Sequence, residues 1–132
     1  MVFNIFVTND DEHLRNHAFL YDTVVACWRL SPLYDVVPRP MVAQERRLHL
    51  GVGAQGRLAT LDNALSEHSA FISNRPEALA AMRRVWGMVR ERQVCFEAIG
   101  ASPQLVQTMG SAIRKLKDIA SAALVKEHRR TG

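Results

Sequence analysis

The sequence predicts a mainly α-helical fold with one short β-hairpin in its N-terminal third. Helical spacing of apolar residues dominates after residue 58, whereas the residues before 37 contain two short runs rich in aromatic and aliphatic side chains. The chain has 132 residues, 48% of them hydrophobic and 23% charged, which suits one globular domain with a buried core. We therefore expect one domain over 1–132, with a distinct segment at 1–36 and a three-helix segment at 59–127.

The N-terminal part begins with a short apolar run, MVFNIFV, followed by a strongly polar stretch, NDDEHLRNH, at 9–17. The runs HAFLYD (17–22) and ACWRLS (26–31) predict a hairpin, although residues 23–25 lack an Asn-Gly or Asp-Gly turn signal. The three prolines of SPLYDVVPRP exclude a helix and favour an extended path. Residues 41–57 mix charges, a histidine and three glycines, which predicts an irregular surface connection.

The C-terminal part predicts three amphipathic helices. Thr60 is placed to cap the first, which extends to about residue 72. Asn74, with Glu77 three residues later, caps a longer one that reaches residue 99, and Ser102 with Pro103 opens the third. Residues at three- to four-residue spacing should form one buried stripe on each helix. They are Leu61, Ala64, Leu65, His68, Phe71, Ile72, Leu79, Met82, Val85, Val89, Phe96, Ile99, Leu105, Met109, Ile113, Leu116, Ala120 and Ala123.

Composition argues against several classes of protein. The opening has no basic region or cleavage site of a secretory signal, and no window approaches 18 consecutive apolar residues, so we expect a cytoplasmic protein without a membrane span. Cys27 and Cys95 are too few for a disulfide framework and are expected to be reduced and buried. The formal charge of +4 permits an anionic partner, but no nucleic-acid-binding motif is present, so direct nucleic-acid binding is not favoured.

The polar stretch at 9–17 is the strongest concentration of chemistry in the chain. His13 and His17 are four residues apart, as in a zinc-binding HExxH helix, but the glutamate of that motif does not follow the first histidine. No serine or cysteine lies in a nucleophile elbow such as GxSxG. Neither a zinc site nor a serine or cysteine nucleophile is therefore favoured.

A phosphoryl-transfer pattern fits the stretch better. Asp11 and Asn16 have the spacing D-x-x-x-x-N of a protein-kinase catalytic loop, and Asp35 follows the hairpin, where kinases place a second metal-binding aspartate. Phosphoryl transfer needs such a set, because hard oxygen ligands hold Mg²⁺ against the phosphates while a separate carboxylate aligns the attacking hydroxyl. Acids and asparagines are also common turn formers, which is the simpler reading of the same residues.

These residues also carry a resemblance to a known family. The pattern N-x-D-x-H-x-x-N, formed by Asn9, Asp11, His13 and Asn16, and the later W-R-L-S-P-x-Y-D that ends at Asp35, resemble the C-terminal part of HipA-type serine/threonine kinases. These kinases are the toxins of toxin–antitoxin systems. HLGVGAQGRLATLDNAL also resembles the family's glycine-containing segment before a helix, so the similarity covers nearly the whole chain. It implies a kinase C-lobe-like helical subdomain, with the hairpin directly after the catalytic loop.

The resemblance implies a role for each matching residue. Asp11 would be the catalytic base, and Asn16 and Asp35 would be Mg²⁺ ligands. His13 and Asn9 would support the loop. ATP would be the phosphoryl donor of the family, although the sequence identifies no ATP-binding residues: GVGAQG at 51–56 fits GxGxxG but lies downstream of the loop and outside a strand-to-helix turn.

The ATP-binding lobe of such kinases lies upstream of the catalytic loop, whereas ten residues precede Asp11 here. We therefore expect a domain truncated at its N-terminus, in which MVFNIFV ends a helix and which is inactive alone. Uncovered apolar surface would favour self-association, or binding to the remaining kinase lobe or a HipB-like antitoxin. The alternative is a non-catalytic helical interaction module that binds the antitoxin or a complementary kinase half.

Overall fold

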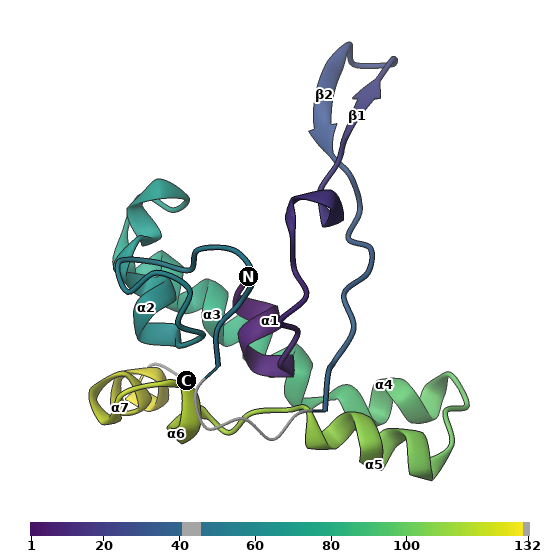
Figure 1. Cartoon of the computed structure of the whole chain (residues 1–132), viewed down its shortest axis with the longest axis vertical. Coiled ribbons are helices and arrows are strands. Elements are labelled where there is room, and N and C mark those ends of the chain that lie inside the picture. Colours follow the sequence, from purple (N-terminus) through teal and green to yellow (C-terminus); the bar gives the residue numbers. More distant parts are fainter. Residues whose placement is uncertain (41–45, 131–132) are drawn as a thin grey trace.

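The computed structural model describes residues 1–40 and 46–130, and it confirms a mainly α fold with a two-stranded antiparallel hairpin. A small helical body carries the hairpin on an extension that rises away from it (Figure 1). The elements, with η for a 3-10 helix, are α1 (Val2–Val7), η1 (Leu14–Asn16), β1 (Phe19–Asp22), β2 (Cys27–Leu30), α2 (Leu61–Ser66), η2 (His68–Ala70), α3 (Arg75–Arg90), α4 (Arg92–Ala98), α5 (Pro103–Ser111), α6 (Leu116–Ile119) and α7 (Ala122–Arg130). Within the described residues, no helix is long and apolar enough to cross a membrane.

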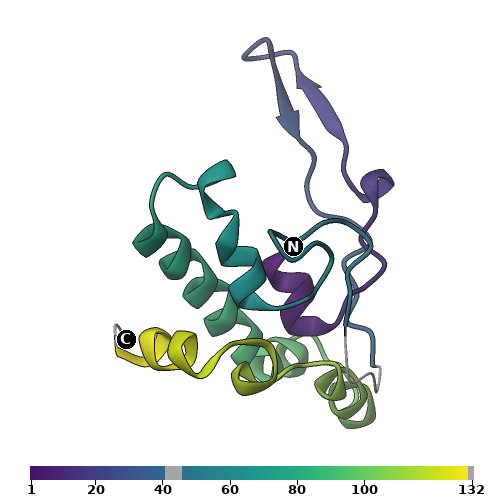
Figure 2. The ribbon, with the colours of Figure 1, turned by 60° about the vertical axis from the view of Figure 1, so that its left-hand side comes forward.

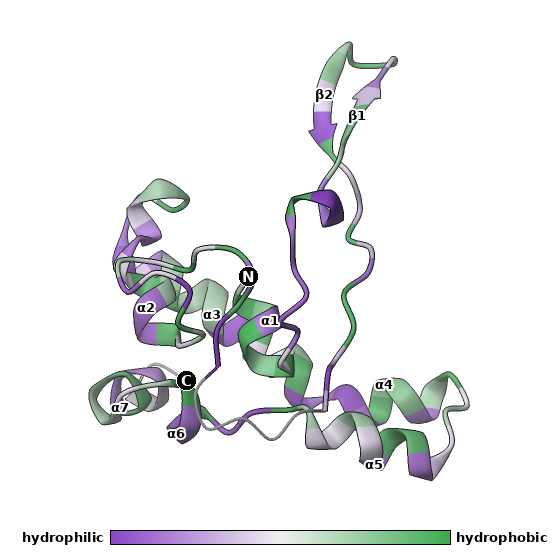
Figure 3. Cartoon of the chain, viewed as in Figure 1, coloured by the Kyte–Doolittle hydropathy of each residue, from purple (hydrophilic) through white to green (hydrophobic). Residues whose placement is uncertain are grey.

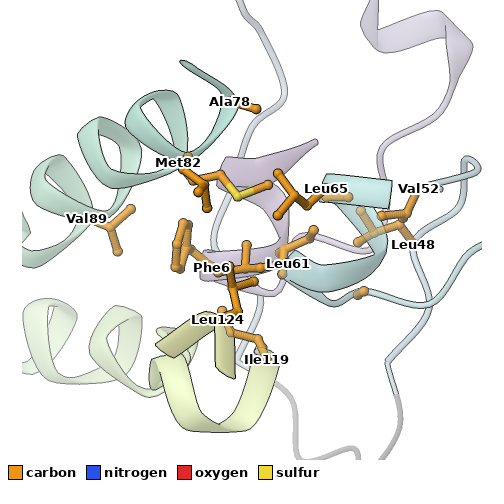
Figure 4. Packing of buried hydrophobic residues seen from close by; sticks show 14 of the residues in the cluster. Phe6, Leu48, Val52, Leu61, Leu65, Ala78, Met82, Val89, Ile119 and Leu124 are labelled. Carbon is orange, nitrogen blue, oxygen red and sulfur yellow. The ribbon is translucent and has the colours of Figure 1, made fainter. Parts of the chain in front are cut away.

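The short helix α1 lies at the centre of the core. A six-residue helix is not stable alone in water, so its stability comes from burial of its apolar side chains. Phe6 is fully buried and stacks on Trp86 of α3, with ring centroids 5.0 Å apart. Helices α2, α3, α6 and α7 supply most of the other core residues, among them Leu61, Met82 and Leu124 (Figure 4). The polar stretch at 9–17 therefore follows directly from a helix that is deeply buried in the core.

The hairpin is confirmed, with strands slightly shorter than the predicted runs. Phe19 pairs with Leu30 and Asp22 with Cys27, and residues 23–26 form the turn. In place of an Asn-Gly pair, the Asp22 carboxylate accepts hydrogen bonds from the backbone N–H groups of Val24 and Val25. This is the local bonding by which an aspartate side chain forms a turn. Figure 2 shows, from a second direction, that the hairpin stands clear of the helices.

The predicted third helix is wrong as a continuous element, because contacts from distant parts of the chain interrupt it. Near its first break, the Ala112 carbonyl accepts a hydrogen bond from Thr8 Oγ1, and the Arg114 N–H donates to the Phe6 carbonyl. At the second break, Ser121 donates from both its N–H and its Oγ to the Asp62 carboxylate. Groups bonded in this way are not available to a continuous helix. The segment therefore divides into α5, α6 and α7.

The predicted second helix also breaks, between α3 and α4 at Glu91, and the Arg92 guanidinium donates to the Val89 carbonyl there. The first ends early, at Ser66, where the Ser66 hydroxyl donates to the Asn63 carbonyl and η2 follows. Four residues predicted to be buried are exposed as a result: Phe71, Ile99, Leu105 and Ala123. The expected burial of the two cysteines was also wrong, since Cys27 and Cys95 are both exposed.

Residues 46–58 form the predicted irregular connection, while 41–45 lie outside the described residues. Two isolated bridges, Arg47 with Leu58 and Gly53 with Gly56, fold this segment on itself, and the Asn63 side chain of α2 bonds its backbone at Gln55, Gly56 and Leu58. A Cβ on Gly53 would lie 1.9 Å from the Asn63 carbonyl oxygen, so close approach of the backbone requires glycine there. Gly53 is thus required by packing, whereas Gly56 has φ 64°, a left-handed conformation that favours glycine.

Candidate functional site

The candidate site consists of the loop between α1 and β1 and the segment that follows β2. Thr8 ends α1 in a left-handed conformation, with φ 59°, and turns the chain into the loop. Asn9 is buried, and its N–H and side-chain amide donate to the backbone and side-chain oxygens of Asn4. The Asn9 side-chain oxygen accepts the N–H of Asp11 at 3.3 Å. The loop that carries Asp11 is thereby anchored to the central helix.

Asn16 joins the two halves of the site. It is buried at the end of η1, where its side-chain oxygen accepts the His13 N–H at 2.9 Å. Its amide nitrogen donates to the Asp35 carboxylate at 2.8 Å. The oxygen of an asparagine side chain has two lone pairs, so one remains after the bond to His13. The Asp35 carboxylate therefore lies against the nitrogen of the Asn16 amide, whose oxygen keeps one lone pair.

The chain returns from the hairpin to place Asp35 there. The Tyr34 hydroxyl donates to the Arg15 carbonyl at 2.6 Å, which closes the base of the hairpin beside the Asn16 contact. Asp35 itself has φ 55°, a left-handed conformation that aspartate and asparagine adopt more readily than most residues. The structure therefore brings Asn16 and Asp35 together across the hairpin, as the sequence pattern predicts.

Asp11 is more exposed than Asn16 and faces a different partner. Its carboxylate lies 3.7 Å from the guanidinium of Arg39, which also pairs with Asp10 at 3.1 Å. The Arg39 N–H donates to the Val7 carbonyl at the end of α1. Sequence reasoning missed Arg39, although it is a lone charge between two prolines of an extended segment. It connects the chain after Asp35 to the loop that holds Asp11.

The two histidines of the stretch do not converge on one point. The His13 ring lies edge-on to His49, with centroids 6.0 Å apart, whereas His17 Nε2 pairs with the buried carboxylate of Glu12 at 3.3 Å. No group of three or more His, Cys, Asp or Glu side chains suited to a metal ion occurs in the part of the chain that the structure describes. The zinc alternative therefore has no geometric support.

A small cavity of 120 Å³ lies between α1 and the hairpin base. Its polar lining includes the two paired residues Asn16 and Asp35 together with the Glu12–His17 pair. Asp11 does not line it. The candidate base therefore does not share this cavity with the two candidate ligands.

Arginines surround the C-terminal end of α1. Arg46 donates to the Thr8 hydroxyl, and Arg114 is bonded through its backbone to Phe6. Burial lowers the pKa of Arg46 below its ordinary value, the positive charge of Arg114 lowers it further, and Asp10 opposes both effects. Burial and the charge of Arg114 together therefore outweigh the attraction of Asp10 at Arg46.

Comparison with family models matched one model, described as the HipA-like C-terminal domain, over residues 1–93. The matched residues run from α1 into α4 and include the whole candidate site. Neither curated proteins nor solved structures gave a significant match.

Proposed function

Because the chain belongs to the HipA-like C-terminal domain family, we propose that it carries the phosphoryl-transfer residues of a HipA-type protein serine/threonine kinase, in a toxin–antitoxin context. The observation that supports this most is the contact between Asn16 and Asp35, two residues 19 positions apart that match the family's metal-binding positions. A turn former needs no such partner across a hairpin.

In this proposal, Asp35 and the free lone pair of Asn16 hold Mg²⁺. The residues fit that ion, because Mg²⁺ prefers oxygen ligands and usually takes one or two carboxylates, with water and phosphate oxygens completing its shell. When bound, it would neutralise charge on the phosphates of ATP. The Asn16 oxygen accepts the His13 N–H and its nitrogen donates to Asp35, so both ends of this amide are held in place.

Asp11 is the proposed general base. Its exposed carboxylate would accept the proton of a serine or threonine hydroxyl as that oxygen bonds to the γ-phosphorus of ATP, while the bond from this phosphorus to the β–γ bridging oxygen breaks and ADP leaves. The Arg39 guanidinium lies 3.7 Å from this carboxylate, where it can orient it, and it also pairs with Asp10. His13 and Asn9 take no part in the proton transfer. The His13 N–H and the Asn9 side chain form hydrogen bonds that position the loop.

Calorimetric titration of the purified chain with ATP, in the presence and absence of Mg²⁺, tests the proposal. We expect Mg²⁺-dependent binding that Asp35→Asn weakens at least tenfold, because the variant keeps the side-chain shape and removes the ligand charge. Asp11→Asn is the matched control, which changes the same atoms in the same loop and should bind as the parent does. Equal binding by the parent and Asp35→Asn would contradict the proposed metal ligands.

A second candidate function, a helical interaction module, is favoured by the pair α4 and α5. Neither helix contains a buried residue. The apolar side chains of Val94, Ile99 and Leu105 are exposed. Most of this pair lies beyond residue 93, where the family match ends. A HipB-like antitoxin or a complementary kinase half would be the partner. Loss of antitoxin binding in Ile99→Asp, with retention in Asp35→Asn, would favour this function.

A further inference from the structure

Among the residues whose side chains the structure describes, Glu12 is the only charged one that is buried. It lies in the hydrophilic loop that follows the largely hydrophobic helix α1 (Figure 3). Its side chain is 10% exposed, whereas those of its neighbours Asp10 and Asp11 are 35% and 56% exposed. Burial of a carboxylate is costly unless polar groups compensate it, and the proposed phosphoryl transfer gives Glu12 no role. This carboxylate is therefore a candidate for a function of its own.

The contacts of Glu12 occupy one of its two oxygens. Oε1 lies 3.3 Å from Nε2 of His17 and 3.4 Å from the amino group of Met1. Oε2 has no hydrogen-bond partner among the described residues. Oε2 is nevertheless not enclosed by protein atoms, so a water molecule can reach it. One half of a buried carboxylate thus keeps its capacity to accept hydrogen bonds.

The cavity beside Glu12 is large enough for several water molecules. Its volume of 120 Å³ corresponds to about four molecules of liquid water. Asn16 and Asp35 line the same cavity. Apolar side chains supply much of the remaining lining: Phe3, Leu30, Leu33 and Val36. Because a hydrogen bond is stronger in such surroundings than in bulk water, the few polar groups of the wall decide where water is held.

Glu12 is not placed to be a further direct ligand of a metal ion. It lines the cavity with Asp35 and His17, yet no three such side chains within residues 1–40 and 46–130 converge closely enough to hold an ion. A contact through water does not need this convergence. Mg²⁺ usually keeps several of its waters when it binds to a protein, and such a water can bridge the ion to a polar group of the protein.

We propose that Glu12 is a positioning residue of the metal site, and that its Oε2 accepts a hydrogen bond from a water retained by the ion at Asn16 and Asp35. This inference rests on the proposed function. The pairing of Oε1 with His17 orients the carboxylate and leaves Oε2 available. Outer partners of this kind hold the shell of a metal ion in place, and their loss commonly costs about tenfold or more in metal affinity.

Titration of the full chain with Mn²⁺ alone, with the free ion measured by electron paramagnetic resonance, tests this role. Mn²⁺ can replace Mg²⁺ at oxygen sites. Glu12→Gln keeps the side-chain shape and an acceptor for His17, and it should weaken Mn²⁺ binding about tenfold. Asp10→Asn is the matched control, because it removes the same charge from the same loop but does not line the cavity. Its affinity for Mn²⁺ should stay within about twofold of the parent value, since solvent screens an exposed charge.

The variant Asp35→Asn separates the role of Glu12 from the proposed ligands. Weaker Mn²⁺ binding in both Asp35→Asn and Glu12→Gln supports the positioning role. Weaker binding in Asp35→Asn alone would overturn the role of Glu12 and leave the proposed ligands intact, as would equal weakening by Glu12→Gln and Asp10→Asn. If Asp35→Asn binds as the parent does, or the parent binds no Mn²⁺, the proposed ligands fail and the role of Glu12 fails with them.

The relaxation of solvent protons by the bound ion gives a measurement on the parent chain itself. Bound Mn²⁺ should still relax these protons strongly, because it retains exchangeable water. Glu12→Gln should leave the relaxation per bound ion unchanged, because no direct ligand is lost. A bound ion that does not relax solvent protons, or a rise in Glu12→Gln from an added water, would overturn the contact through water.

Discussion

The side-chain amide of Asn16 donates a hydrogen bond of 2.8 Å to the Asp35 carboxylate, and this bond joins the loop before the hairpin to the segment after it. The bond from Tyr34 to Arg15 lies beside it. These two bonds close the base of an element whose own strands are four residues each. The two candidate metal ligands therefore also hold the base of the hairpin together.

Substitution of Asp35 should separate these two roles. Asp35→Asn keeps a side-chain oxygen acceptor and tolerates the left-handed backbone, whereas Asp35→Ala loses the acceptor and is strained there by about 1–2 kcal/mol. We expect amide hydrogen exchange in β1 and β2 to quicken about tenfold in Asp35→Ala and to change little in Asp35→Asn. Equal amide exchange rates in the two variants would mean that the bond between Asn16 and Asp35 does not stabilise the hairpin.

Gly53 should be intolerant of any side chain. A Cβ at this position would lie 1.9 Å from the Asn63 carbonyl oxygen and 2.8 Å from its carbon, so Gly53→Ala must displace backbone. Overpacking of this kind costs about 1–3 kcal/mol of unfolding free energy, measurable by urea denaturation. Gly51→Ala is the control, because a Cβ there has no atom within 4 Å. A similar loss in both variants would refute the steric explanation.

His128 should make the fold less stable in acid. Burial lowers the pKa of His128 below its ordinary value of 6.5, and the positive charge of Arg83 adds to the effect. The unfolded chain then binds a proton that the folded chain does not, so stability is greatest above pH 6.5 and falls as the pH decreases toward the folded pKa. Urea denaturation at several pH values should show a shallower acid loss in His128→Gln. Identical pH profiles would exclude a contribution from this residue.

The sequence predicted those parts of the fold that rest on local signals. Thr60, Asn74 and Ser102 each cap a helix through the side chain, as their positions indicate. The hairpin was likewise recognisable from two short runs of aromatic and aliphatic residues. These features depend on neighbours within a few positions, which a single sequence displays.

The breaks in the long helices could not be predicted in this way. They depend on bonds such as Thr8 to Ala112 and Asp62 to Ser121, whose partners lie 104 and 59 positions apart. The helical spacing of apolar residues continues through both breaks, so this spacing does not indicate where the helix ends. Ile99 is exposed for a different reason: it ends α4, which follows the break at Glu91 and contributes no buried residue.

In the candidate site, too, one contact could be predicted from the sequence and another could not. The proximity of Asn16 and Asp35 was predictable, because a hairpin returns the chain to its starting point. The pairing of Arg39 with Asp10 and Asp11 was not, because an extended proline-flanked segment has no periodicity that fixes where its charge lies. The roles of Asp11, Asn16 and Asp35 in catalysis stay predictions.

The proposed metal site is tested most directly by measuring whether one ion lies close to both Asn16 and Asp35. Mn²⁺ can replace Mg²⁺ at oxygen sites and broadens the NMR signals of nearby nuclei. With ATP present, substoichiometric Mn²⁺ should broaden the side-chain amide signal of Asn16 strongly and that of Asn63, buried beneath the Gly53 turn, very little. Excess Mg²⁺ should reverse the effect, and Asp35→Asn should abolish it. An Asn16 signal that stays sharp, or that broadens equally in Asp35→Asn, would contradict the assignment of these two residues as metal ligands.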